Sequence, residues 1–146
     1  MIQRGGSGVE WPMRVYIIAY IAAAIVMAGL DFVWLRLTVD AVYQPVIGSL
    51  MSPKPDMAAA VAFYVMYVCG VVIFGVRPGL AAGAWQTGLL FGALFGLFAY
   101  GTYDLTNMAT LKVWSLKLTL IDMAWGTVLT GTAAAVSTTV ALAFEK

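Results

Sequence analysis

Long apolar stretches, separated by isolated charged residues, make up most of this sequence. Residues 57–76 include no charged side chain, and neither do residues 78–103. Each stretch is long enough to cross a hydrocarbon core of about 30 Å as an α-helix that rises about 1.5 Å per residue. Two further stretches, one near each end of the chain, are equally long but contain one aspartate each, Asp31 and Asp122. The pattern therefore predicts four transmembrane helices, at about 14–37, 57–76, 79–104 and 116–143.

Residues near the ends of these helices predict how the helices begin and how they are connected. Asp56 and Ser115 directly precede the second and fourth helices, where each is suited to act as an N-cap. The Arg-Pro-Gly segment 77–79 predicts a tight turn between the second and third helices. The connection between the first and second helices is unusually apolar, which favours a segment on the membrane surface or re-entering the membrane. Its apolar residues are Val46, Ile47, Leu50 and Met51.

The composition supports the same class. The sequence is 62% hydrophobic and 10% charged, whereas soluble domains are about 25% charged. We therefore expect an all-α polytopic membrane protein, a single four-transmembrane-helix bundle formed by residues 13–146. Residues 1–12, which include several glycines, are expected to be a flexible N-terminal tail.

Charge and residue usage exclude several kinds of function. The formal net charge is +1 without a basic cluster, so a nucleic-acid partner is not expected. The sequence has no histidine and one cysteine, Cys69. Histidine-ligated haem, zinc sites, Ser-His-Asp catalysis and an intrachain disulfide are therefore excluded within this chain. We expect no cofactor and no metal site.

A stripe of small residues marks the third predicted helix. Gly88, Gly92 and Gly96 recur at intervals of four and so lie on one face of a helix. Small residues allow close approach of helix backbones in lipid, so this helix is expected to pack centrally. The same face could alternatively clear space for a ligand, or pair with a second copy or another membrane protein.

Three aspartates are expected in one layer near one face of the membrane. Four antiparallel spans place the end of the first and third helices beside the start of the second and fourth. Asp31, Asp104 and Asp122 all belong to this side, together with most of the aromatic residues of the spans. The candidate ligand-binding residues are Asp31, Trp34, Tyr64, Tyr67, Tyr100, Tyr103, Asp104, Asn107, Asp122 and Trp125.

Two interpretations of these acids stay open. Each acid could have a structural role near the interface: Asp31 could pair with Arg36, and Asp122 with Lys117. Asp104 could pair with Lys112 or cap the following turn. Alternatively the acids converge inside the bundle, because intramembrane aspartates are costly and usually face an interior or a wet cavity. A converged site could share a proton, bind a cation, hold a polar lipid head, or bind an amine against aromatic walls.

The favoured function is that of a membrane binding or transport-type protein with a small polar or amphiphilic ligand in this pocket. One alternative is a membrane enzyme that acts on a lipid or isoprenoid with an aspartate as general acid or base. Another is an accessory subunit of a membrane complex. Membrane lipid is the expected surrounding partner, and the membrane orientation stays open because positive charges are equal on the two sides.

Several short motifs carry a family resemblance. The most specific is the segment 100–107, Tyr-x-Thr-Tyr-Asp-Leu-Thr-Asn. With Asp31-x-x-Trp34-Leu35, Phe63-Tyr64-x-x-Tyr67, Trp114 and Asp122-x-x-Trp125-Gly126, the chain from Met13 onward resembles an uncharacterised bacterial family of small four-span membrane proteins. Pro78-Gly79 departs from the Pro-Ala of that family. The resemblance implies a multi-pass protein of the bacterial cytoplasmic (inner) membrane and brings no established activity.

Overall fold

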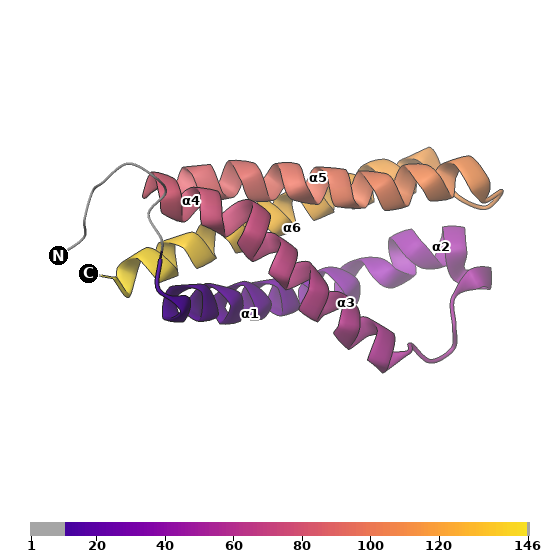
Figure 1. The fold of residues 1–146 in the computed structure, drawn as a ribbon. Helices are drawn as coiled ribbons and strands as arrows, with labels where there is room; N and C mark the ends of the chain where they lie inside the picture. The colour runs from indigo at the N-terminus through magenta and orange to yellow at the C-terminus, as the bar shows by residue number, and fades with distance from the viewer. Residues whose placement is uncertain (1–10, 146) are drawn as a thin grey trace.

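The computed structural model describes residues 11–145, which form four long helical rods without a strand among them (Figure 1). By length and composition all four rods can cross a membrane, which confirms the predicted all-α, four-span class. Residues 1–10 of the expected N-terminal tail lie outside the described residues. The rods are Met13–Leu50, Met57–Ala82, Trp85–Thr110 and Leu116–Ala143.

The first rod extends beyond the predicted end near residue 37. α1 is followed without a break by a π-helical turn, a short α-helix and a 3-10 turn, so the apolar segment predicted as an interfacial connection is mostly a continuation of the rod. Pro45 lies in the first turn of the short helix, where a missing N–H is tolerated. The elements are α1 (Met13–Thr38), η1 (Val39–Tyr43), α2 (Gln44–Ile47) and η2 (Gly48–Leu50).

The second rod also runs through its predicted end. Asp56 accepts hydrogen bonds from the backbone N–H groups of Ala58 and Ala59, which confirms the predicted N-cap. The turn predicted at 77–79 is helical in the structure, and a π-helical turn just before Pro78 accommodates the missing proline donor. The elements are α3 (Met57–Gly70), η3 (Val71–Val76) and α4 (Arg77–Ala82).

The chain reverses instead at Gly83. This glycine follows α4 with a φ of 61°, the left-handed conformation that glycine adopts without steric penalty. The N–H of Gly83 bonds the Leu80 carbonyl, and the N–H of Ala84 bonds the Gly79 carbonyl. The third rod therefore starts later than predicted, and it ends about six residues later, at Thr110.

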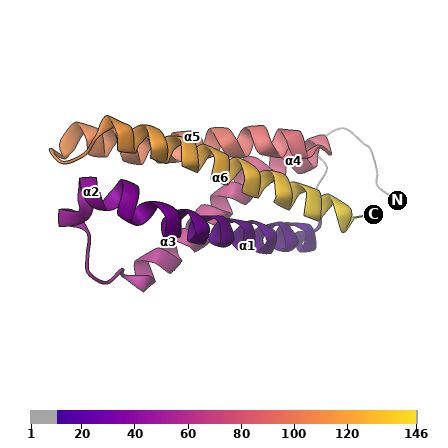
Figure 2. The ribbon, with the colours of Figure 1, turned by 180° about the vertical axis from the view of Figure 1, so that it is seen from behind.

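The third and fourth rods, α5 (Trp85–Thr110) and α6 (Leu116–Ala143), run antiparallel along their lengths (Figure 2). The Ser115 hydroxyl accepts a bond from the Leu118 N–H, which confirms it as the N-cap of α6. Residues spaced four apart along α5 contact residues spaced four apart, in the reverse direction, along α6. A Cβ at the α5 glycines would contact α6, and Tyr100 lies against Gly126. The successive pairs are Gly88 with Thr138, Gly92 with Ala134, Gly96 with Thr130, and Tyr100 with Gly126.

The glycine stripe is thus an interface inside one chain. A Cβ on Gly92 would lie 2.8 Å from the Thr130 carbonyl oxygen, so the helix backbones approach closely, as the packing interpretation expected. α6 covers Gly88, Gly92 and Gly96, and pairing with a second copy or another membrane protein stays an untested alternative.

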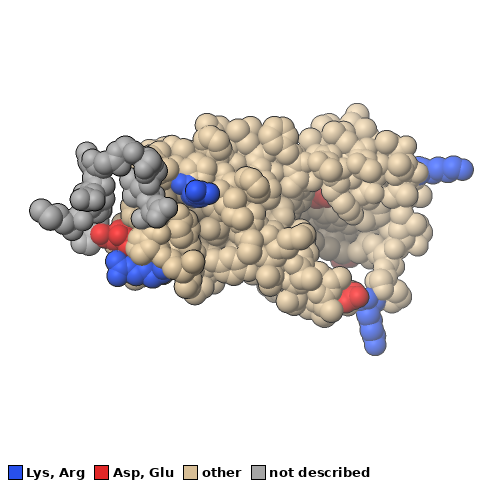
Figure 3. Space-filling model, in the orientation of Figure 1, with Lys and Arg blue, Asp and Glu red and all other residues tan. Residues whose placement is uncertain are grey.

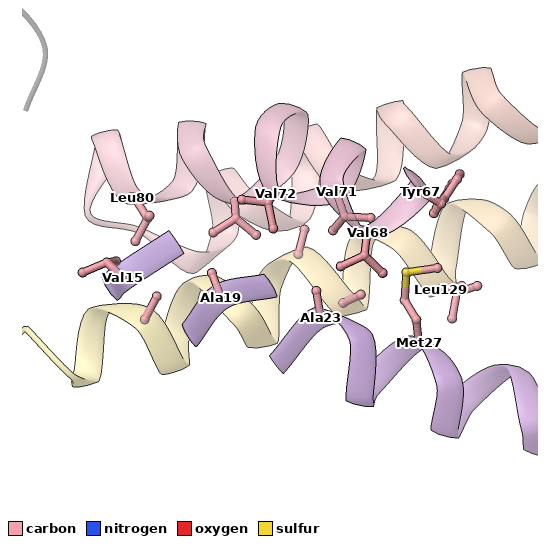
Figure 4. Packing of buried hydrophobic residues seen from close by; sticks show 14 residues of the cluster. Val15, Ala19, Ala23, Met27, Tyr67, Val68, Val71, Val72, Leu80 and Leu129 are labelled. Carbon is pink, nitrogen blue, oxygen red and sulfur yellow. The ribbon is translucent and has the colours of Figure 1, made fainter. Parts of the chain in front are cut away.

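A second stripe at intervals of four packs α1 against η3 and α6. Val15, Ala19, Ala23 and Met27 are all buried, and they form one cluster with residues such as Val68 (Figure 4). Asp31 is one step further along the same buried face of α1. The outward faces of the rods carry many exposed large apolar side chains, as expected for surfaces in contact with lipid.

Candidate functional site

Asp31 connects three helices. Its side chain is buried, and each of its two oxygens accepts a hydrogen bond. The Tyr64 hydroxyl of α3 donates to Oδ2 at 2.6 Å, and the Trp125 indole N–H of α6 donates to Oδ1 at 3.0 Å. The acid of α1 is therefore held by neutral donors from α3 and α6.

A hydrogen-bonded and stacked chain continues from Asp31 to Asp122. The Trp34 and Trp125 rings stack with centroids 4.3 Å apart and an interplanar angle of 4°. The Trp34 indole N–H donates to the Tyr43 hydroxyl at 3.0 Å, and that hydroxyl donates to Asp122 Oδ1. The two acids thus belong to one network that also fixes η1 to α6.

The sequence interpretation missed Tyr43. It was assigned to an interfacial or re-entrant connection, whereas the helical continuation through η1 brings its ring back to α6. Its position nine residues after Trp34 gave no signal of the contact, because two and a half helical turns place such a residue on roughly the opposite side of an ideal helix. In the structure a wider π-helical turn, Val39–Tyr43, lies between the two residues.

Asp104 is the least solvated of the three acids. Its residue is 0% exposed, and both carboxyl oxygens are buried without a hydrogen-bond partner among the described residues. Asp104 is four residues after Tyr100 on α5, and Asp122 is four residues before Gly126 on α6. Because Tyr100 lies against Gly126, the antiparallel register of the two helices places Asp104 opposite Asp122. Their charges are also close enough to interact, as are those of Asp122 and Asp31. Two carboxyls therefore face each other at the most tightly packed helix pair of the protein.

A cavity of about 370 Å³ lies beside these acids, between α3, α5 and α6. Four of its six lining residues are aromatic, one is an acid, and no lysine or arginine lines it. In the space-filling view, acidic atoms are visible inside a hollow on this face, while the positive charges lie toward the two ends of the molecule (Figure 3). The lining residues are Phe63, Tyr67, Ala99, Tyr100, Tyr103 and Asp122.

The candidate residues fall into three groups. Asp31, Trp34, Tyr64, Asp122 and Trp125 form the network, whereas Tyr67, Tyr100 and Tyr103 line the cavity with Asp122. Asp104 is buried and does not line the cavity, and Asn107 is half-buried outside both groups. Whether these residues bind a ligand stays a prediction.

The alternative that the acids are ion-pair partners finds no support. Within residues 11–145 the ion pair is Arg14 with Glu145, at 3.2 Å, at the far end of the bundle. Asp31 and Asp122 take neutral donors instead, and Asp104 takes none. Part of the reason is that the helices continue past their predicted ends, so Asp31 and Asp104 are deeper in their rods than the sequence suggested.

Comparison with known protein families identifies the family of this chain. Residues 16–139, which include most of all four rods, match the model of a family described as "Predicted membrane protein (DUF2177)". The chain belongs to the DUF2177 family. This confirms the resemblance to a four-span family of unknown function and an integral membrane location. No curated protein and no solved structure matches the chain. The family description of DUF2177 names no chemistry, so arguments about function rest on the site itself.

Removing one donor of the network is expected to destabilise the fold. In Trp125→Phe, Asp31 Oδ1 loses its indole partner while the stacked ring is partly retained, so we expect a loss of about 1–3 kcal/mol. Thermal unfolding of the purified protein in detergent measures it. Trp85→Phe is the control, since Trp85 is exposed and donates no side-chain hydrogen bond within the described residues. Equal losses in the two variants would contradict a role of the network in stability.

Proposed function

We propose that this protein binds a small amphiphilic ligand with a cationic head in the cavity between α3, α5 and α6, as a binding or transport-type protein of the bacterial cytoplasmic membrane. The observation that carries the proposal is the composition of the cavity wall. Phe63, Tyr67, Tyr100 and Tyr103 surround a space to which Asp122 contributes the charge.

The sign of the charge selects the ligand class. An anionic head group, such as a phosphate or carboxylate, would need a lysine, an arginine or several free N–H donors, and no basic side chain lines the cavity. A cation is attracted by the Asp122 carboxylate and by the faces of aromatic rings, at roughly 0.5–2 kcal/mol per ring. The chemistry therefore favours an amine or quaternary ammonium head.

The surroundings favour a ligand that also has an apolar part. Outside the cavity, α3 and α5 carry exposed apolar residues such as Val65, Met66 and Phe98. A head group at Asp122 can therefore be joined to a tail that stays among lipid chains. The volume of about 370 Å³ suits a head group and the first part of such a tail.

The accessory-subunit alternative is less well supported. It relied on the glycine stripe as a surface for a partner helix, and α6 of the same chain occupies that surface. The enzyme alternative would assign Asp122 as general acid or base, with the Tyr43 hydroxyl as its donor. It shares the binding site proposed here, so the binding experiment comes first.

The test is a binding measurement with probes that differ in charge. The protein in lipid nanodiscs is titrated with dodecyltrimethylammonium, with neutral dodecanol and with anionic laurate, and the signal of empty nanodiscs is subtracted. We expect saturable binding of the cation alone. In Asp122→Asn, which removes charge at nearly constant shape, cation affinity should fall roughly tenfold or more, equivalent to about 1.4 kcal/mol.

Asp40→Asn is the matched control, because Asp40 is exposed on η1 and belongs to neither the network nor the cavity wall. It should bind the cation like the unaltered protein. Equal cation affinity in Asp122→Asn and Asp40→Asn, or equal binding of all three probes, would refute the proposal.

A further inference from the structure

The pair formed by Asp104 and Asp122 has a chemistry that ligand binding alone does not require. Asp122 lines the cavity, whereas Asp104 does not line it and is fully buried, without a donor for either oxygen among the described residues. Burying an ionised carboxylate without a partner costs far more free energy than burying the protonated carboxyl. Asp104, in the close α5–α6 interface, therefore needs a group that neutralises its charge. The smallest such group for a carboxylate is a proton.

The groups around Asp104 do not offset its charge. Asp122 faces it from α6, and Tyr43 of η1 and Tyr103 of α5 are close enough to feel its charge. Asp31 of α1 adds a further negative charge near Asp122. The Tyr43 hydroxyl already donates to Asp122. Lysines near the ends of the two helices, Lys112 and Lys117, are exposed and form no ion pair with either acid. Two facing carboxyls without a cation between them titrate as one pair that retains a proton.

We infer that Asp104 and Asp122 form a carboxyl pair that holds one proton in the empty protein and releases it when a cation occupies the cavity. The release half of this inference rests on the proposed function, and the proton-holding half does not. The site then works as an exchanger in which a proton and a cationic ligand compete for one negative charge.

The exchange balances in atoms and in charge. A cation enters beside Asp122, the O–H bond of the pair breaks, and the proton leaves to water while its electron pair stays on the carboxylate. No redox partner takes part. The site carries the same total charge before and after, so the exchange adds no further charge to the low-dielectric interior. Ligand affinity should therefore fall with decreasing pH, by up to about tenfold per unit where the pair is protonated.

The proton itself can be detected without any ligand. In infrared spectra of the protein in nanodiscs, a protonated carboxyl gives a C=O band that is separate from carboxylate bands and shifts in D2O. We expect this band in the unaltered protein and in Asp40→Asn, and its loss in Asp104→Asn, which leaves Asp122 as a single carboxylate with the Tyr43 donor. Absence of the band from the unaltered protein would overturn the inference and leave the proposed ligand site intact.

Proton release is measured in the unaltered protein, so it does not depend on a variant that folds. Dodecyltrimethylammonium has no titratable proton, and a pH-sensitive dye in weak buffer near neutral pH reports protons that come from the protein. About one proton per bound cation supports the inference. Cation binding without release overturns it and leaves the proposed function standing.

The remaining outcomes separate the two proposals. If Asp104→Asn still binds the cation but releases no proton, the carboxyl pair is the source of the released proton. Unchanged proton release in that variant overturns the inference. If no cation binds to the unaltered protein, the proposed function and the exchange both fail, and the infrared band alone decides whether the pair holds a proton.

Discussion

Gly92→Leu is expected to lower stability by about 3 kcal/mol or more, and it is the most damaging single substitution that we predict. A Cβ at this position already lies 2.5 Å from the Cβ of Ala134 and 2.8 Å from the carbonyl oxygen of Thr130. The second contact is to helix backbone, which cannot rotate away as a flexible side chain can. A leucine there forces α5 and α6 apart along their whole interface.

Leu90→Ala is the control on the same helix. Leu90 is 56% exposed on the outward face of α5, so its truncation removes contact with lipid or detergent and leaves the interface intact. We expect a change within about 0.5 kcal/mol. Thermal unfolding of both variants in one detergent gives the comparison. Similar midpoints for the two variants would mean that the glycine stripe is not the tight interface described above.

Ala99→Trp is expected to abolish cation binding while the protein stays folded. Ala99 lines the cavity between Tyr100 of α5 and the aromatic residues of α3, and it is only half-buried. A tryptophan there can extend into the empty space without displacing backbone, and it takes the volume that a head group needs. Affinity for dodecyltrimethylammonium should fall by a factor of about 100 or more, which corresponds to about 2.7 kcal/mol.

Ala28→Trp adds the same side chain at an exposed position of α1. It should leave both the unfolding temperature and the affinity unchanged, so it separates cavity filling from a general effect of an added tryptophan. Ala99→Trp that binds the cation normally, with an unaltered unfolding temperature, would place the ligand elsewhere.

The spans and two of the caps could be predicted because they depend on local chemistry. Uninterrupted apolar length predicted the four rods, and the side-chain oxygens of Asp56 and Ser115 predicted where α3 and α6 begin. The ends of the first two rods, at Leu50 and Ala82, could not be predicted in this way. They were predicted at residues 37 and 76 instead. Each was placed at a polar or proline signal, and the structure passes both signals by means of π-helical turns.

Which face of each helix is buried could be predicted in part from the sequence. Asp31 continues a buried α1 stripe at intervals of four, and Asp104 lies eight residues after Gly96 on the glycine face. On α6, Asp122 is four residues before Gly126. Each acid therefore extends a stripe of closely packed residues. The sequence does not indicate which helix receives each stripe, because that depends on contacts between distant segments, and for the same reason Tyr43 was missed.

The position of the bound cation can be located by photo-crosslinking. A long-chain quaternary ammonium with a diazirine next to its nitrogen is bound to the protein in nanodiscs, irradiated, and its attachment sites are mapped by mass spectrometry. Labels should concentrate on Phe63, Tyr67, Tyr100 and Tyr103 and should be lost in Asp122→Asn. Labels spread evenly over outward apolar residues such as Ile17, and unaffected by Asp122→Asn, would contradict a cation site in this cavity.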